Sequence, residues 1–138
     1  MITIIVSVLD KQWYKAHKLR SMNIEEYRTY CLNKKGVTEG FPFGEGTLVF
    51  KVMNKMFALT GVESFASVNL KCDPELAIEL REEFYSIIPG YHMSKKHWNT
   101  IEMEGDVTDN KIYELIDLSY NLVVKGMTKK LREELASM

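Results

Sequence analysis

Two strand-like segments joined by a very short turn restrict the fold of this chain more than any other feature. The first is "TLVFKVM", the second is "MFALT", and the pair "NK" at Asn54 and Lys55 separates them. Both segments are rich in β-branched and aromatic residues, which favour strands. A connection this short joins only antiparallel neighbours. The pattern therefore predicts a β-hairpin over residues 47–60.

The next segment, "FASVNLK", predicts a third strand that is buried on one face only. Apolar and polar side chains alternate along it, with Ala66, Val68 and Leu70 on one side and Ser67, Asn69 and Lys71 on the other. This period of two is typical of a strand that covers a core with one face and meets water with the other. We expect Asn69 and Lys71 to point outward.

Two segments of intermediate length carry the start signals of helices. In "NIEEYRTYCLNKKG", Asn23 is a good N-cap and Glu26 follows three residues later, as in a capping box. Gly36 is expected to stop this helix. In "DPELAIELREEFYS", Asp73 precedes Pro74, which is the favoured arrangement of N-cap and first helical residue.

A long helix is predicted from Thr108 or Asp109 to a break at Gly126. Its apolar residues recur at helical spacing, and the expected buried stripe consists of Ile112, Leu115, Ile116, Leu122 and Val123. The following "TKKLREELA" predicts a short, charged last helix.

The stretch after Pro89 and Gly90, "YHMSKKHWNTIEMEG", has little that favours a long helix. It predicts two strands that meet near residues 94–96, the second running from about His97 to Met103. The element order is then α-β-β-β-α-β-β-α. Since runs of strands with short connections pair antiparallel, we expect a two-layer α+β domain in which the helices cover one face of the sheet.

Length and composition indicate one globular domain. The chain has 138 residues, 46% of them hydrophobic and 27% charged, with no apolar run long enough to span a membrane. The apolar first nine residues lack a positive n-region and a small-residue cleavage site, so we expect a cytoplasmic protein without a membrane partner. The two cysteines, Cys31 and Cys72, form no CxxC motif and are expected to be buried, reduced thiols.

The net charge of −1 is unevenly distributed. Residues 1–21 carry four basic residues and one acidic residue, a net of +3, so the rest of the chain carries −4. A mildly acidic body argues against tight nonspecific binding of nucleic acid, because affinity for phosphate comes from clustered lysine and arginine. Any binding of this kind requires a local basic patch.

The stretch "PGYHMSKKHWNT" is the most concentrated candidate site. If residues 97–103 form a strand whose Ile101 and Met103 enter the core, Trp98 points to the outer face. There it would join outward lysines, an arrangement suited to stacking a base beside phosphate contacts. The alternative is that these residues pack the hairpin onto the helices. The candidate nucleic-acid-binding residues are Lys51, Lys71, Lys95, Lys96, His97 and Trp98.

No catalytic or metal-binding pattern is evident. His92 and His97 are five residues apart, a spacing that does not bring two imidazoles together on a helix or on a strand. No HExxH or CxxC motif accompanies them. We therefore expect no metal, no cofactor and no enzymatic activity.

Several stretches together resemble the MmcQ/YjbR family of small bacterial proteins. They are "LVFKVMNKMFALT", "VNLKCDPELAIELRE", "IPGYHMSKKHWNTI" and "LIDLSYNLVVKGMTKKLREEL". The resemblance covers residues 22–138 and implies a fold similar to type III secretion chaperones. Residues 1–21 depart from the family pattern and are interpreted as an N-terminal extension, either a genuine appendage or residues upstream of a native start at Met22.

The resemblance also implies a function. Members of the family are commonly labelled DNA-binding, on the basis of a double-wing arrangement of β-hairpins, and no catalytic residues come with the family. The leading expectation is a DNA-binding protein. The alternative is a protein-interaction or chaperone-like module, with a protein partner or a second copy bound to the open sheet face.

Overall fold

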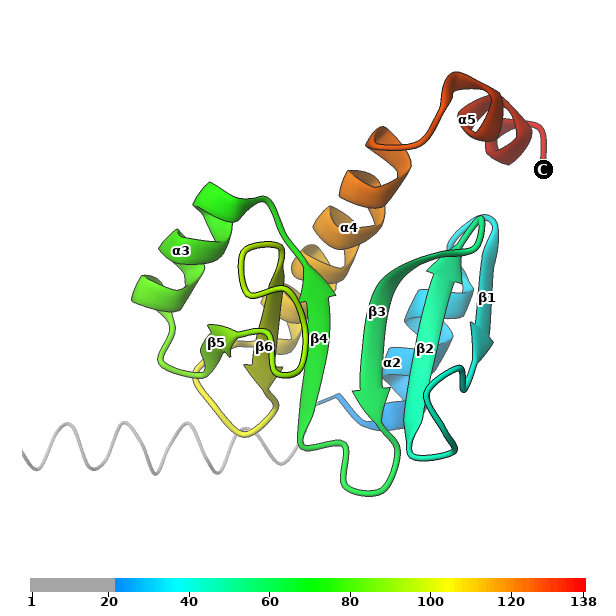
Figure 1. Cartoon of the computed structure of the whole chain (residues 1–138). Coiled ribbons are helices and arrows are strands. Elements are labelled where there is room, and N and C mark those ends of the chain that lie inside the picture. Colours follow the sequence, from blue (N-terminus) through cyan, green and yellow to red (C-terminus); the bar gives the residue numbers. More distant parts are fainter. Residues whose placement is uncertain (1–21) are drawn as a thin grey trace, which may run out of the picture.

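The structure, a computed structural model, describes residues 22–138, so the extension predicted at residues 1–21 lies outside it. Six strands form one antiparallel sheet in the order β1-β2-β3-β4-β6-β5 (Figure 1). The strands are β1 (Val37–Gly40), β2 (Thr47–Val52), β3 (Lys55–Gly61), β4 (Ser67–Lys71), β5 (Ile87–Pro89) and β6 (Trp98–Glu102). The helices are α2 (Ile24–Leu32), α3 (Pro74–Glu83), α4 (Asp109–Lys125) and α5 (Lys129–Ala136).

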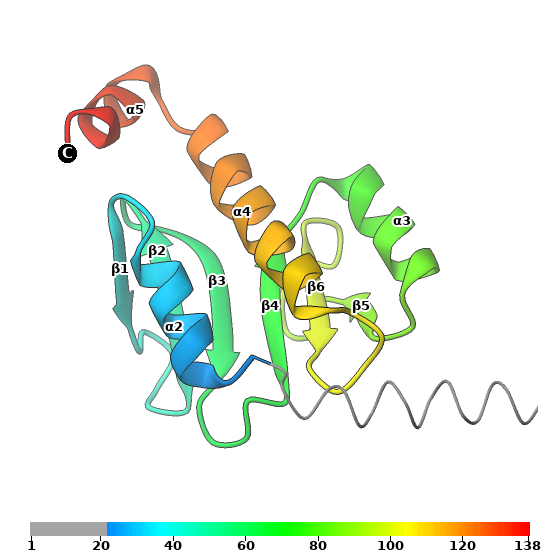
Figure 2. The same ribbon diagram turned by 180° about the vertical axis from the view of Figure 1, so that it is seen from behind.

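Helices α2, α3 and α4 lie on the same face of the sheet, and Figure 2 shows them in front of it. The predicted two-layer α+β architecture is therefore confirmed. The main core lies between the layers and includes Tyr27, Phe50, Phe57, Ile101 and Ile116, each at most 1% exposed. Among residues 22–138, no helix is both long and apolar enough to cross a membrane.

The predicted helix starts are confirmed in their atomic detail. The Asn23 side chain accepts a hydrogen bond from the Glu26 amide at 2.8 Å, and the Glu26 carboxylate accepts one from the Asn23 amide. Asp73 caps α3 by accepting from the amides of Glu75 and Leu76. These caps satisfy amides that have no partner inside the helix.

Three details of the predicted strands were wrong. Strand β1 was missed, because its four residues contain a glycine and directly follow the turn at Gly36. The β2–β3 turn consists of Met53 and Asn54, both at positive φ, and not of Asn54 and Lys55. Positive φ at both central residues is the geometry of a two-residue type I′ turn, which matches the twist of the strands it joins.

The third error concerns the last hairpin. Its first strand is β5, which ends at Pro89, and residues 90–97 form a long loop before β6 begins at Trp98. The two strands therefore do not meet near residues 94–96. The predicted second strand is confirmed, since β6 pairs with both β4 and β5.

A side chain from α4 completes the sheet where β3 and β4 separate. A register shift in β3 leaves Phe57 without a partner in β2, as in a β-bulge. Ser119 Oγ donates a hydrogen bond to the Phe57 carbonyl and accepts one from the Lys71 amide at 2.9 Å. Buried Ser119 thus links β3 to β4 beyond Ala58 and Leu70, where the register of these two strands ends.

Candidate nucleic-acid interface

The outer face of the sheet, the one away from the helices, carries the side chains that the alternation predicted. Lys51 lies between Phe50 and Val52, which both enter the main core. Lys71 is the register partner of Trp98, and Asn69 is the register partner of Thr100. Partners in an antiparallel pair point to the same face, so Lys71 and Trp98 share the outer face.

Trp98 is covered although it lies on this outer face. Trp98 is 8% exposed and forms a second apolar cluster with Val49 and Leu59, against which Met56 and Met93 pack. Met93 comes from the loop of residues 90–97. The indole therefore has little free surface on which a base could stack in this conformation, and its part in binding stays a prediction.

Most of the "PGYHMSKKHWNT" stretch is occupied in shaping its own loop. The Gly90 amide donates to the Trp98 carbonyl at 2.8 Å, and the Tyr91 amide donates to Thr100 Oγ1 at 3.0 Å. Arg81 of α3 donates to Asn99 Oδ1 at 2.7 Å and to the Lys95 carbonyl. These contacts support the packing interpretation for the backbone of this segment.

The exposed side chains of the loop are the ones available to a ligand. Lys95, Lys96 and His97 are all exposed. The Lys95 ammonium donates one hydrogen bond, to the Gly90 carbonyl at 3.2 Å, so two of its three N–H groups can donate to a ligand. The His97 carbonyl accepts from the Cys72 amide at 2.8 Å, so this residue also fixes the loop to the end of β4.

Five lysines meet at one end of the sheet, and we call them the lysine edge: Lys51, Lys55, Lys71, Lys95 and Lys96. The antiparallel order places them together, because β2 and β4 end where β3 and β6 begin. Among the residues that the structure describes, none of the five takes part in an ion pair; the pairs found are Arg28–Glu39, Lys34–Asp117, Lys111–Glu114 and Lys129–Glu133.

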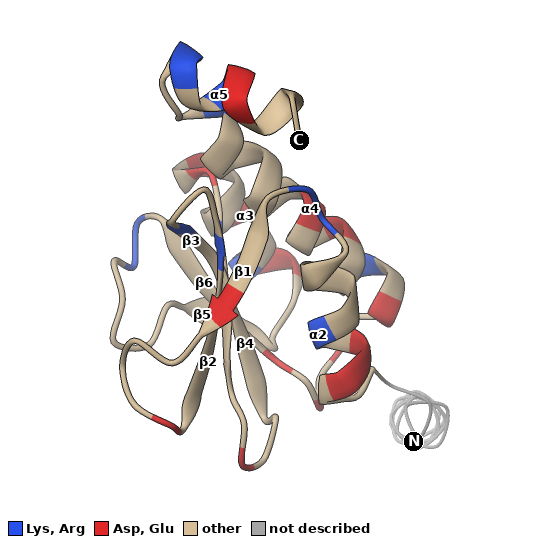
Figure 3. Cartoon of the chain, turned by 90° about the vertical axis from the view of Figure 1, so that its right-hand side faces the viewer, with Lys and Arg blue, Asp and Glu red and all other residues tan. Residues whose placement is uncertain are grey.

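The opposite end of the sheet is acidic. Glu45 and Glu63 lie in the turns there, and Glu102 ends β6. Figure 3 shows acidic turns at the lower end and Lys and Arg segments towards the upper end of the outer face. The slightly negative chain therefore presents a local basic surface, which its net charge alone does not reveal.

An open hollow of about 410 Å³ lies beside the lysine edge, over strands β1 and β2. Its lining includes the outward positions Thr38, Gly40 and Val49, and the ammonium-bearing Lys51. The loop after β1 forms a wall with Phe41 and Pro42. Glu39 and Asn54, the latter at the hairpin turn, complete the lining. Sequence reasoning missed this hollow, since it did not predict β1, which pairs with β2 and forms part of the lining.

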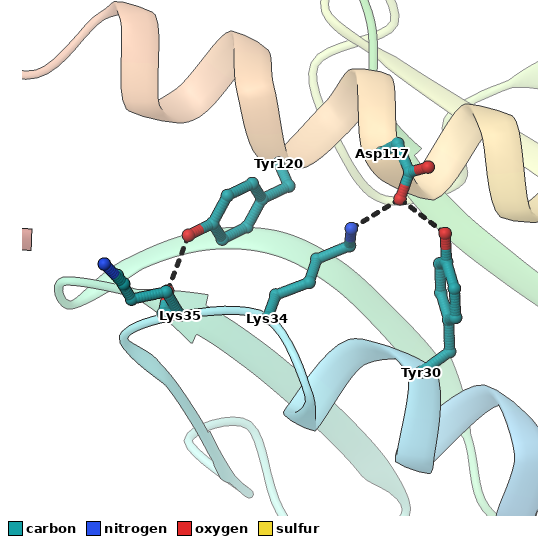
Figure 4. Close-up of polar contacts among 5 residues, drawn as sticks. All are labelled: Tyr30, Lys34, Lys35, Asp117 and Tyr120. Atoms are coloured by element: carbon teal, nitrogen blue, oxygen red, sulfur yellow. Dashed lines mark hydrogen bonds and ion pairs between the residues drawn. The ribbon is translucent and has the colours of Figure 1, made fainter. Parts of the chain in front are cut away.

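A polar network between α2 and α4 has a structural role. Tyr30 Oη donates to Asp117 Oδ1 at 2.7 Å, and the Lys34 ammonium donates to the same oxygen (Figure 4). Tyr120 Oη donates to the Lys35 carbonyl at 2.6 Å. Burial and the hydrogen bond to Asp117 raise the pKa of Tyr30 to about 12. These hydrogen bonds tie α4 to α2 and to the turn that follows α2.

Neither cysteine has the environment of a reactive thiol. Burial raises the pKa of Cys31 to about 12 and that of Cys72 to about 11. Both thiols are therefore protonated at neutral pH, whereas thiol nucleophiles require the thiolate. In residues 22–138, no group of three or more His, Cys, Asp or Glu side chains is arranged to hold a metal ion.

The fold and this surface define a small two-layer α+β protein with an open, partly basic sheet face. Comparison with known proteins gives its family: residues 32–122 match the YjbR family model, and the chain belongs to that family. The Escherichia coli K12 protein YjbR is 33% identical over 118 residues, which are 85% of this chain and all of that protein. The Bacillus subtilis protein YyaQ is 39% identical over 75 residues, 54% of this chain and 63% of that protein.

Solved structures agree with this assignment. The Deinococcus radiodurans protein DR2400 superposes with a TM-score of 0.76 and 42% identity, covering 83% of this chain and 88% of that one. A Pseudomonas syringae protein superposes with a TM-score of 0.61 and 28% identity, covering 73% of this chain and 98% of that one. The curated relatives are described as uncharacterized proteins, so their names state no activity.

Proposed function

We propose that this protein binds nucleic acid through the lysine edge and performs no chemistry on it. The observation that carries the proposal is that five lysines without ion-pair partners, among the described residues, lie at one end of the sheet, with Lys51 and Lys71 on its outer face. Unpaired ammonium groups close together are what phosphate oxygens require, and they release counterions from the nucleic acid when they bind. The nearby carboxylate of Asp73 is occupied in capping α3.

The outer face is less suited to a protein partner. A flat, apolar face would favour a protein-interaction or chaperone-like module. Here the apolar residues Val49 and Leu59 are at most 7% exposed, and charged Lys51 and Lys71 flank them. An exposed surface of this composition favours a polyanion over an apolar protein segment.

The test compares two pairs of adjacent lysines, one on the lysine edge and one on α5, where Lys129 pairs with Glu133. Affinity for a fluorescein-labelled oligonucleotide would be measured by anisotropy over a salt series. Lys95→Ala with Lys96→Ala should weaken binding and reduce the slope of log K against log salt by about 1.4 to 1.8, the contribution of two phosphate contacts. Lys129→Ala with Lys130→Ala on α5 removes the same charge and should change the slope little.

Two results would contradict the proposal. One is wild-type protein with no affinity for nucleic acid at low salt. The other is an equal loss of affinity in both double variants, because this would show a response to net charge and not to the lysine edge.

A further inference from the structure

The hollow beside β1 has the shape of a ligand site that opens onto the outer face. Its volume of about 410 Å³ lies within the ~300–1,000 Å³ usual for small-ligand sites. Its floor contains Gly40 and Val49, which are register partners on neighbouring strands. A Cβ atom built on Gly40 meets no atom within 4 Å, so the absence of a side chain at this position keeps the hollow open.

The wall of the hollow is an aromatic ring that is not used elsewhere in the fold. Phe41 is 50% exposed. Its ring makes none of the aromatic contacts found in the part of the chain that the structure describes. An exposed phenylalanine at a cavity is a platform on which a planar group can stack, and every nucleobase offers such a face.

A cation lies in the same hollow. Lys51 lines it and belongs to the lysine edge. Lys71 lies two strands further across the sheet, at a spacing of about 10 Å from the usual distance between strands. One side of the hollow thus offers a stacking surface, and the other continues into groups that bind phosphate.

We infer that the nucleic acid bound by this protein is single-stranded, with one unpaired base held in the hollow against Phe41 and its backbone on Lys51 and Lys71. The inference rests on the proposed function and specifies its ligand. A base in a duplex is paired and stacked on both faces, so it cannot enter a hollow unless it leaves the stack. Pockets that take splayed bases are a feature of single-strand recognition.

Two variants remove the base site while leaving the lysines unchanged. Phe41→Ala removes the stacking surface, and Gly40→Val fills the hollow with a side chain that meets no protein atom where its Cβ lies. The matched control is Phe43→Ala, because Phe43 is 65% exposed and belongs to the same loop but does not line the hollow. Thermal melting of all three variants checks that they fold.

The probes are a labelled oligothymidylate and a labelled duplex of equal length. Wild-type protein should bind the oligothymidylate more tightly than the duplex. Phe41→Ala should weaken oligothymidylate binding by about 5- to 150-fold, the loss expected for one stacked base, and Gly40→Val should act in the same direction. Phe43→Ala should have an affinity close to that of the wild type.

The outcomes separate this inference from the proposed function. Tighter binding of duplex, or unchanged affinity in both hollow variants while the Lys95 and Lys96 pair still matters, overturns the base site and leaves nucleic-acid binding in place. Wild-type protein that binds neither probe overturns both.

Discussion

Lys71 and Trp98 lie directly opposite each other on β4 and β6, with both side chains on the outer face. Lys71 is partly exposed, whereas Trp98 is only 8% exposed. The two residues therefore share a face but not a role. The lysine is available to a ligand, whereas the tryptophan holds the loop of residues 90–97 against the sheet through Met93.

Replacement of Trp98 should reduce stability more than any change in the neighbouring lysines. Trp98→Ala empties the centre of the second apolar cluster and should lower the free energy of unfolding by about 3–5 kcal/mol. Lys71→Ala should change it by less than about 0.5 kcal/mol. Urea denaturation followed by circular dichroism measures both, and equal effects in the two variants would contradict the assignment.

Gly90 should not tolerate a side chain. Its ideal Cβ would lie 2.8 Å from Trp98 Cβ and 3.0 Å from the Trp98 carbonyl oxygen, which belongs to the backbone and cannot rotate away. Gly90→Ala should cost about 1–3 kcal/mol, the range for overpacking. Gly46→Ala is the control, since its Cβ meets nothing within 4 Å, and a similar melting temperature in the two variants would refute the prediction.

The α2–α4 network should contribute measurably to stability. Asp117→Ala leaves the Tyr30 hydroxyl and the Lys34 ammonium without their shared acceptor, and the side chain of Lys34 is only 17% exposed. We expect a loss of about 1–2 kcal/mol. Glu114→Ala breaks an exposed i,i+3 pair with Lys111 and should cost less than about 0.5 kcal/mol. A double-mutant cycle with Tyr30→Phe would show whether the network acts as a unit.

Cys31 should make the protein less stable in alkali. Burial raises its pKa in the folded state to about 12, so as pH rises the unfolded chain releases the thiol proton first. The contribution of the protonated thiol to the free energy of unfolding is intact below the unfolded pKa of about 8.5. It is lost as pH rises towards 12, at up to about 1.4 kcal/mol per pH unit. Unfolding free energies measured between these limits should fall less steeply in Cys31→Ala. If the free energy of unfolding falls equally with pH in the wild type and in Cys31→Ala, the Cys31 thiol is not the cause of the loss.

The sequence predicted the features that are determined by residues close together in the chain. The alternation in "FASVNLK" and the parity of Ile101 and Met103 placed Lys71 and Trp98 on the correct face, because strand geometry has a fixed period of two. The caps at Asn23 and Asp73 were equally readable, since their partners lie within three residues.

The features that sequence reasoning missed depend on contacts between distant residues. Trp98 is covered because Met93 folds back from a loop whose path is set by Arg81 on another element. Likewise, the hollow exists because β1 pairs with β2 and positions Gly40 opposite Val49. The four residues of β1 have no alternation of their own that would predict this pairing.

Because Ser119 bridges β3 and β4, the hydrogen bond of one sheet amide, that of Lys71, depends on a helix side chain. The Lys71 amide is bonded to a side chain of α4 and not to another strand, so its exchange with solvent deuterium reports the docking of that helix. The side chain of Lys71, which belongs to the lysine edge, lies on the outer face of the sheet, away from α4. A displacement of α4 would therefore remove a hydrogen bond from the backbone of Lys71, whose side chain lies on the face of the sheet away from that helix.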